Sequence, residues 1–214
     1  MEDFETLLAG SAREHGHLCA GQVIGVRMAL LGLELVGLKN TRRGPDIKKL
    51  IVYVEIDRCA TDAIGYVTGT RLGRRSLKFK DYGVMAATFV NLEIGRAYRI
   101  VSTEQSRELA AAYTPDILNK SQTQLEAYKK MPLHDLFDVY EVRVDIPETD
   151  FPGPTRAKAE CGSCGAVIRD GREIKVNGQV LCHFCNGQAY YKHPLKVDLS
   201  TKNLSIKSMQ RSES

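Results

Sequence analysis

The spacing of apolar residues over the first 146 positions predicts a mixture of helices and strands. Apolar side chains recur at three- and four-residue steps over 2–14 and, most strongly, over 19–38, which predicts two helices. Three further helical segments are expected at 60–69, 103–112 and 116–130. Runs rich in β-branched residues or alternating in polarity predict strands at 50–57, 77–80, 84–91, 97–102 and 137–146. We therefore predict one α+β domain over 1–146, with a mainly antiparallel sheet packed by helices.

The strongest predicted helix, 19–38, contains three glycines, at Gly21, Gly25 and Gly32. Glycine lowers the helix propensity of this segment, but it also lets a neighbouring element approach the helix closely. We interpret these glycines as positions of close packing.

The pattern changes after residue 146. Three of the seven prolines lie at Pro147, Pro152 and Pro154, which predicts a stiff linker over 147–158. A cysteine-rich module follows over 159–195. The segment 196–214 is rich in Ser and Lys and is expected to be mobile.

The cysteine-rich module has the spacing of a structural zinc site. Cys161 and Cys164 form one Cys-x-x-Cys pair, Cys182 and Cys185 form a second, and 17 residues separate the two pairs. Two such pairs supply four thiolates to one tetrahedral ion, and this closed shell leaves no position for a substrate. The alternative is a pair of redox dithiols, but nothing thioredoxin-like surrounds either pair.

The residues between and after these pairs predict the shape of the module. Segments 173–176 and 179–181 flank Asn177-Gly178, a favoured two-residue hairpin turn. A short helix over 186–192 would complete a zinc-ribbon or treble-clef shape. The module is too small for a large apolar core, so zinc is expected to supply most of its folding free energy.

A second group of metal-ligand residues lies near the start of the chain. His15, His17 and Cys19 fall within five residues, immediately before the 19–38 helix. A thiol at a helix start lies at the positive end of the helix dipole, which favours the thiolate. Cys59 has a parallel placement between a strand and a helix, and Asp62 stands where its carboxylate can reach back to that helix start.

Two interpretations of this second group remain open. Cys19, Cys59 and one histidine form a Cys₂His zinc site with a fourth position open to water or substrate, if the fold brings them together. Alternatively, the cysteines are buried packing residues and the histidines belong to a loop.

Composition narrows the function classes. The formal charge of +4, the absence of Trp and the 7% aromatic content give no argument for nucleic-acid binding. No apolar run approaches the ~20 residues that span a bilayer, and no export signal opens the chain, so we expect a cytoplasmic protein. In that compartment the six cysteines are not expected to form disulfides.

Three ordered motifs resemble a known family. The segment 15–25, His-Gly-His-Leu-Cys-Ala-Gly-Gln-Val-Ile-Gly, resembles the opening motif of the family named for the E subunit of formylmethanofuran dehydrogenase. Segment 59–69, with Cys-Ala-Thr-Asp-Ala-Ile and Thr-Gly, and segment 73–83, ending in Phe-Lys-Asp-Tyr-Gly, resemble its second and third motifs in the same order. The resemblance covers about 11–145.

The resemblance implies an α+β fold, a homodimer and an origin in anaerobes. It also implies a relation to a complex that interconverts carbon dioxide and formylmethanofuran on a molybdenum or tungsten cofactor, carried by other subunits. It suggests that His17, Cys19, Cys59 and Asp62, with His15, converge on one metal or reactive-thiol site. Some members carry a C-terminal zinc-finger-like domain, which this chain also has.

The sequence departs from the family pattern at two informative positions. Thr70 replaces a cysteine that many members have, which removes a possible metal ligand. Val84 replaces a common lysine, which removes a cation for an anionic substrate. Both changes put the full family activity in doubt.

Three functions compete at this point. The first is an enzyme or accessory subunit of one-carbon metabolism, in which Cys19, Cys59 and Asp62 act at a second metal site, with zinc expected. The second is a metal- or metabolite-sensing regulatory protein whose zinc module contacts a protein or a nucleic acid through nearby basic side chains. The third is a scaffold in which both metal sites are structural. A larger enzyme complex is a possible partner in the first and third cases.

Overall fold

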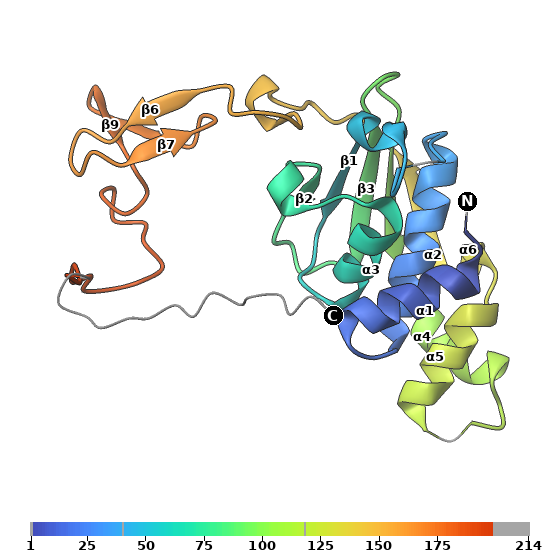
Figure 1. The fold of residues 1–214 in the computed structure, drawn as a ribbon. Coiled ribbons are helices and arrows are strands. Elements are labelled where there is room, and N and C mark those ends of the chain that lie inside the picture. Colours follow the sequence, from blue (N-terminus) through green and yellow to red (C-terminus); the bar gives the residue numbers. More distant parts are fainter. Residues whose placement is uncertain (1, 40, 118, 199–214) are drawn as a thin grey trace, which may run out of the picture. The chain divides into compact units, whose positions relative to one another are not determined.

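A computed structural model describes residues 2–39, 41–117 and 119–198, which group into two compact units divided between Pro154 and Thr155. Each unit is described by itself. The first contains a five-stranded sheet with helices packed on it (Figure 1). The prediction of an α+β fold with a mainly antiparallel sheet is confirmed.

The sheet has the strand order β2-β1-β3-β4-β5, and its only parallel pair is β1 with β2. The strands are β1 (Leu50–Val54), β2 (Leu77–Phe79), β3 (Ala86–Asn91), β4 (Ala97–Ser102) and β5 (Phe137–Glu141). The central strand β3 is buried along its whole length. The sheet is therefore built around β3 and its two antiparallel neighbours.

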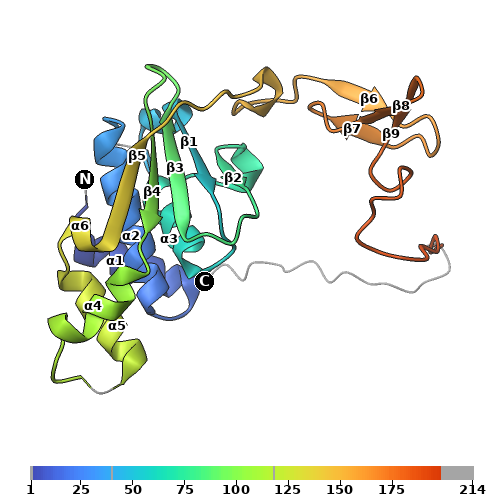
Figure 2. The same ribbon diagram turned by 180° about the vertical axis from the view of Figure 1, so that it is seen from behind.

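Helices cover one face of this sheet, as the two opposite views show (Figures 1 and 2). The helices are α1 (Phe4–His15), α2 (Ala20–Leu35), α3 (Cys59–Thr68), α4 (Gln105–Tyr113), α5 (Lys120–Lys130) and α6 (Leu133–Leu136). Short 3₁₀ turns occur at Pro45–Lys49, Leu72–Arg74 and Glu148–Asp150. Val23, Val26 and Met28 of α2 are fully buried, which makes α2 the central helix of the core.

The predicted segments of the first unit are present, with ends that differ by a few residues. The largest difference is the strand predicted over 137–146, which ends at Glu141. Its partner β4 begins at Ala97, and the last bond between them runs from the Val142 N–H to the Ala97 carbonyl at 3.0 Å. Beyond that point the chain has no neighbouring strand to extend the ladder.

The segment predicted as the start of a linker contacts the first unit. Asp150 lies 3.7 Å from the Lys78 ammonium and 3.7 Å from the Arg75 guanidinium. The boundary between the units follows Pro154.

The second unit consists of two hairpins. Strands β6 (Lys158–Glu160) and β7 (Val167–Arg169) form the first, and β8 (Ile174–Val176) and β9 (Gln179–Leu181) form the second. The predicted Asn177-Gly178 turn is confirmed, with φ values of 50° and 78°. Such positive φ values at both central residues are those of a type I′ hairpin turn.

The prediction of a helix over 186–192 is wrong. Residues 183–187 form turns, and the chain continues to 192 without helical structure. Gly187 adopts φ 75°, a left-handed conformation that ends a helical turn. The unit thus has the ribbon form without the helix of a treble clef. The tail predicted to be mobile lies largely outside the described residues.

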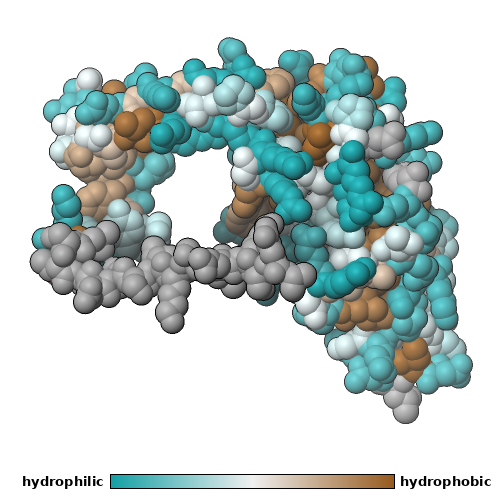
Figure 3. Space-filling view, viewed as in Figure 1, coloured by the Kyte–Doolittle hydropathy of each residue, from teal (hydrophilic) through white to brown (hydrophobic). Residues whose placement is uncertain are grey.

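Among the described residues no helix is long and apolar enough to cross a membrane. The visible face of the first unit carries mostly hydrophilic residues, with small apolar patches between them (Figure 3).

Gly25 allows α2 and α3 to pack together. A Cβ atom at this position would lie 2.5 Å from the Ala60 carbonyl oxygen and 2.7 Å from the Ala63 Cβ. Both neighbours belong to α3, and the contact with backbone cannot be relieved by a side-chain rotation. The prediction that glycines of this helix allow close packing is confirmed.

We therefore expect Gly25→Ala to lower the free energy of unfolding by about 1–3 kcal/mol, the usual cost of overpacking. Gly65→Ala on α3 is the matched control, because its Cβ would meet neighbours only at 3.4 Å or more. That control should be neutral or stabilising by up to about 1 kcal/mol, since Ala favours the helix. Urea unfolding of both variants measures this, and equal stabilities would contradict it.

Candidate metal centres

The first candidate centre is formed where α1 ends and α2 begins. His15 is the last residue of α1, and Gly16 follows with φ 100°, which turns the chain out of the helix. Cys19 then caps the start of α2 in an extended conformation, and its side chain makes no capping hydrogen bond. This short turn places both histidines and Cys19 on one side of the connection.

The ligand atoms of His15, His17 and Cys19 lie within 4.8 Å of one another. The two imidazole rings are 4.7 Å apart between centroids and inclined by 41°. Imidazole nitrogen and thiolate sulfur are the ligands that zinc prefers. These three residues could therefore hold a metal ion.

Asp62 orients the ring of His15. Its Oδ2 lies 2.8 Å from His15 Nδ1, so Asp62 lies beside the group of candidate ligands. The other ring nitrogen, Nε2, is buried and has no hydrogen-bond partner among the described residues. Metal-binding histidines are commonly arranged this way, with a carboxylate fixing one nitrogen so that the other faces the ion.

Cys59 lies beside Cys19 but outside the group of three. It is the first residue of α3, and a Cβ added at Gly21 would lie 3.0 Å from the Cys59 Cβ and 3.7 Å from the Cys19 sulfur. Burial raises the pKa of the Cys59 thiol, and the neighbouring Cys19 side chain raises it further. At this helix start, burial outweighs the dipole that was expected to favour the thiolate.

A buried glutamine, which the sequence analysis missed, ties the three helices around this centre. Gln22 of α2 accepts a hydrogen bond from the Ser11 hydroxyl of α1 and donates one, at 2.7 Å, to the Cys59 carbonyl of α3. Gln22 is completely buried. A glutamine on the apolar face of a predicted helix, three residues after Cys19, was the signal for this role.

A cavity of about 450 Å³ adjoins the centre. His15 and Asp62 form part of its wall, so a ligand in the cavity would contact the metal-binding group. The other lining residues are Ser11, Glu14, Thr61, Gly65, Tyr66, Thr70, Arg71, Leu72 and Leu77. Its size is in the range that holds small-molecule ligands.

Thr70, at the position where the resemblance suggested a cysteine, also lines this cavity. Its hydroxyl is buried and lies 2.7 Å from the Thr68 hydroxyl. Each hydroxyl thus has the other as a hydrogen-bond partner. Position 70 therefore contributes a hydrogen-bonded hydroxyl to the cavity wall in place of a thiol.

The second candidate centre is the cysteine cluster of the second unit. The sulfurs of Cys161, Cys164, Cys182 and Cys185 all lie within 4.8 Å of one another. Backbone N–H groups point at two of them: Cys182 N lies 3.3 Å from the Cys161 sulfur, and Cys185 N lies 3.4 Å from the Cys182 sulfur. This is the arrangement of two Cys-x-x-Cys turns that face one ion.

The pKa values of this cluster differ widely. Backbone N–H groups of Cys164 and Cys182 lower the pKa of the Cys161 thiol to about 6. The pKa of Cys185 rises to about 12, because burial and the neighbouring thiols outweigh a hydrogen bond with Ser163 that lowers it. Four thiolates so close together need a cation to offset their repulsion.

Comparison with known proteins identifies the class. The family described as "FmdE, Molybdenum formylmethanofuran dehydrogenase operon" matches residues 14–142. The chain belongs to this family, as its three ordered motifs predicted. It is also similar to the crystal structure of an FmdE-like protein from Syntrophus aciditrophicus, which is named for the E subunit of a tungsten formylmethanofuran dehydrogenase. The TM-score is 0.57 at 17% identity, over 89% of this chain and 95% of that one, which shows a common fold.

A curated relative carries a different name. The chain is 25% identical, over 205 residues, to a "Probable S-adenosyl-L-methionine-binding protein" from Archaeoglobus fulgidus. The match covers 86% of this chain, which spans about half, 53%, of that relative's length.

We expect Gln22→Met to lower the free energy of unfolding by about 1–3 kcal/mol, because the buried Ser11 hydroxyl loses its acceptor and the Cys59 carbonyl loses a donor. Gln188→Met, in the second unit, is the control and should leave the stability of the first unit unchanged. Thermal unfolding followed by circular dichroism measures the difference, and an unchanged Gln22→Met variant would contradict the bridging role.

Proposed function

We propose that this protein binds two zinc ions, one at His15, His17 and Cys19 and one at the four cysteines of the second unit. The observation that carries the first site is the buried His15 Nε2 atom, which has no partner in the described part of the chain while Asp62 holds the other ring nitrogen. A cation beside two other ligand atoms would satisfy it. The mixed nitrogen and sulfur donor set favours zinc.

The two sites have different roles in this proposal. Four cysteines close the coordination shell of the second site, so its zinc is structural. In the second unit Cys161 and Asp170 are the only buried residues among those described, so the ion replaces the apolar core that this unit lacks.

A zinc ion held by these three ligands would have a fourth position for water or a small ligand, and His15 also lines the adjoining cavity. A divalent ion held there would supply Lewis acidity to a small ligand. Asp62 fixes the orientation of His15, and the half-buried Cys59 side chain stands beside the ligand Cys19. We propose that the domain acts on or presents a small ligand of one-carbon metabolism, as an enzyme or an accessory subunit.

Metal content tests this proposal. Anaerobically purified full-length protein should contain two zinc equivalents by plasma mass spectrometry. His15→Ala should lose the first zinc and Cys164→Ser the second, so each variant should contain one equivalent. His134→Ala is the matched control, since this histidine is 81% exposed and lies outside both groups, and it should retain two.

Asp62→Asn refines the test. It should retain the first zinc at saturating metal but bind it about 10–100-fold more weakly in competition with a chelating dye, because the amide orients the imidazole less strongly. Two equivalents in His15→Ala would overturn the first site, and unchanged metal content in Cys164→Ser would overturn the second.

A second candidate function is a sensor of S-adenosylmethionine, which the name of the Archaeoglobus relative suggests. The cavity beside the first site has groups for each part of a charged amino-acid ligand. Arg71 could hold a carboxylate and Glu14 an ammonium group, and these two side chains lie 3.7 Å apart. The ring of Tyr66 offers a π face to a sulfonium.

Isothermal titration calorimetry with S-adenosylmethionine tests this second function. Arg71→Gln should weaken binding by about tenfold, because it removes a charged hydrogen bond. Arg74→Gln, an exposed neighbour outside the cavity, should bind like the wild type. Equal affinities of the two variants, or no heat of binding to the wild type, would exclude this role for the cavity.

A further inference from the structure

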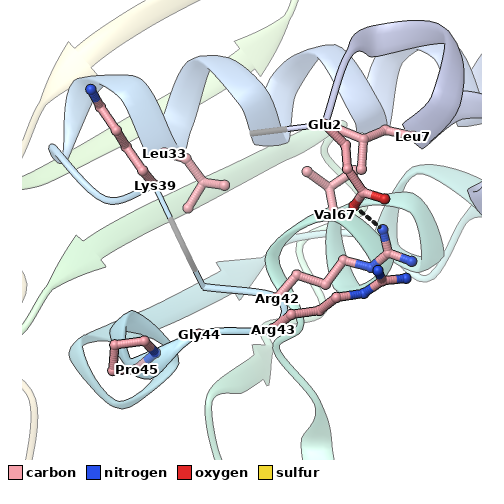
Figure 4. A pocket seen from close by; sticks show the side chains of 9 residues that line it. All are labelled: Glu2, Leu7, Leu33, Lys39, Arg42, Arg43, Gly44, Pro45 and Val67. Carbon is pink, nitrogen blue, oxygen red and sulfur yellow. Dashed lines mark hydrogen bonds and ion pairs between the residues drawn. The ribbon is translucent and has the colours of Figure 1, made fainter.

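A second cavity, of about 430 Å³, lies among α1, α2, α3 and the loop 41–45, and it shares no lining residue with the cavity beside the first metal centre. It is lined by Glu2, Leu7, Leu33, Lys39, Arg42, Arg43, Gly44, Pro45 and Val67 (Figure 4). Apart from Val67, which lies within segment 59–69, these residues lie outside the family motifs and the metal centres. The cavity therefore requires its own explanation.

The floor of this cavity is apolar. Leu7, Leu33 and Val67 come from three different helices, and each is less than 5% exposed. Because they belong to the continuous hydrophobic core, the floor is fixed in shape. Such a surface favours an aliphatic or aromatic group over water.

The rim of the cavity is cationic at one end. Figure 4 shows the guanidinium groups of Arg42 and Arg43 side by side near Glu2, while the Lys39 ammonium points away from them. Glu2 Oε2 lies 2.6 Å from the Arg42 guanidinium. Arg43 is exposed and forms no ion pair among the described residues, so one carboxylate faces two guanidinium groups.

The position of this rim is well defined. The Arg42 guanidinium carbon lies 3.8 Å from the centroid of the Tyr66 ring, which holds it by a cation–π contact. The loop backbone approaches the end of α3 at Gly69, where a Cβ would lie 2.8 Å from the Arg42 Cα. Gly69 also has φ 74°, so this position needs glycine for both reasons.

We propose that this cavity binds an amphiphilic anion, an organic phosphate or carboxylate with an apolar part. The apolar part lies on Leu7, Leu33 and Val67, and the anionic group bridges Arg42 and Arg43, in the geometry in which paired guanidinium groups recognise phosphate. Glu2 occupies part of the same cationic surface, so it competes with the ligand for Arg42.

Octyl phosphate, below its micellar concentration, is the probe, and isothermal titration calorimetry on the full chain is the measurement. Arg43→Gln should weaken its binding by about tenfold. Glu2→Gln should tighten it by about two- to fivefold, because it removes the internal competitor. Arg96→Gln, which changes an exposed arginine that does not line this cavity, should bind like the wild type.

The opposite effects expected for Arg43→Gln and Glu2→Gln distinguish binding at this site from nonspecific attraction of an anion to a basic protein. Inorganic phosphate alone should bind at least tenfold more weakly than octyl phosphate, because it lacks the part that contacts the floor. Equal affinity in wild type and Arg43→Gln, or no binding of octyl phosphate to the wild type, would overturn the proposal. Equal affinity for both phosphates would overturn the role of the apolar floor. Unchanged melting temperatures in the variants confirm that the fold is intact.

Discussion

The close contact between α2 and α3 is the constraint on which the rest of the first unit depends. It exists because Gly25 removes the Cβ that would meet the Ala60 carbonyl, and because Gly21 leaves room for Cys59. With the helices at this distance, the start of α3 lies beside the start of α2. Two cysteines that are 40 residues apart in the chain thus become neighbours, and Asp62 comes within hydrogen-bonding distance of His15.

The polar contacts at this junction depend on the same packing. Gln22 can reach both Ser11 and the Cys59 carbonyl only when the three helices meet closely. These bonds satisfy polar groups that would otherwise be buried without partners, which fixes the helices in register. The candidate centre is therefore held by core packing, although His17 lies in the short connection between α1 and α2.

The two units obtain their stability by different means. The first has a continuous core built on α2 and β3, whereas in the described part of the second, 155–198, almost no side chains are buried. In such a small unit, the proposed metal–thiolate bonds would take the place of apolar burial. The two candidate centres differ in the same way, since one lies at the edge of a preformed core and the other is the centre of its own unit.

Local patterns in the sequence predicted the elements of the first unit, the Asn177-Gly178 hairpin and the four-cysteine cluster. These features depend on periodicity, turn residues and short spacings, which neighbouring residues decide. The predicted helix over 186–192 is absent because Gly187 takes a left-handed conformation in the folded module. The predicted strand 137–146 ends at Glu141 because its partner begins at Ala97.

What the sequence by itself determined is the family, the order of the elements and the residues that are candidates for metal binding. Only the tertiary structure decided that Asp62 contacts His15 of α1, and that burial raises the pKa of Cys59 despite its place at a helix start. It alone brought Arg42 and Arg43 to the rim of an apolar cavity. Each of these depends on distances between segments far apart in the chain, which core packing sets and local sequence does not encode.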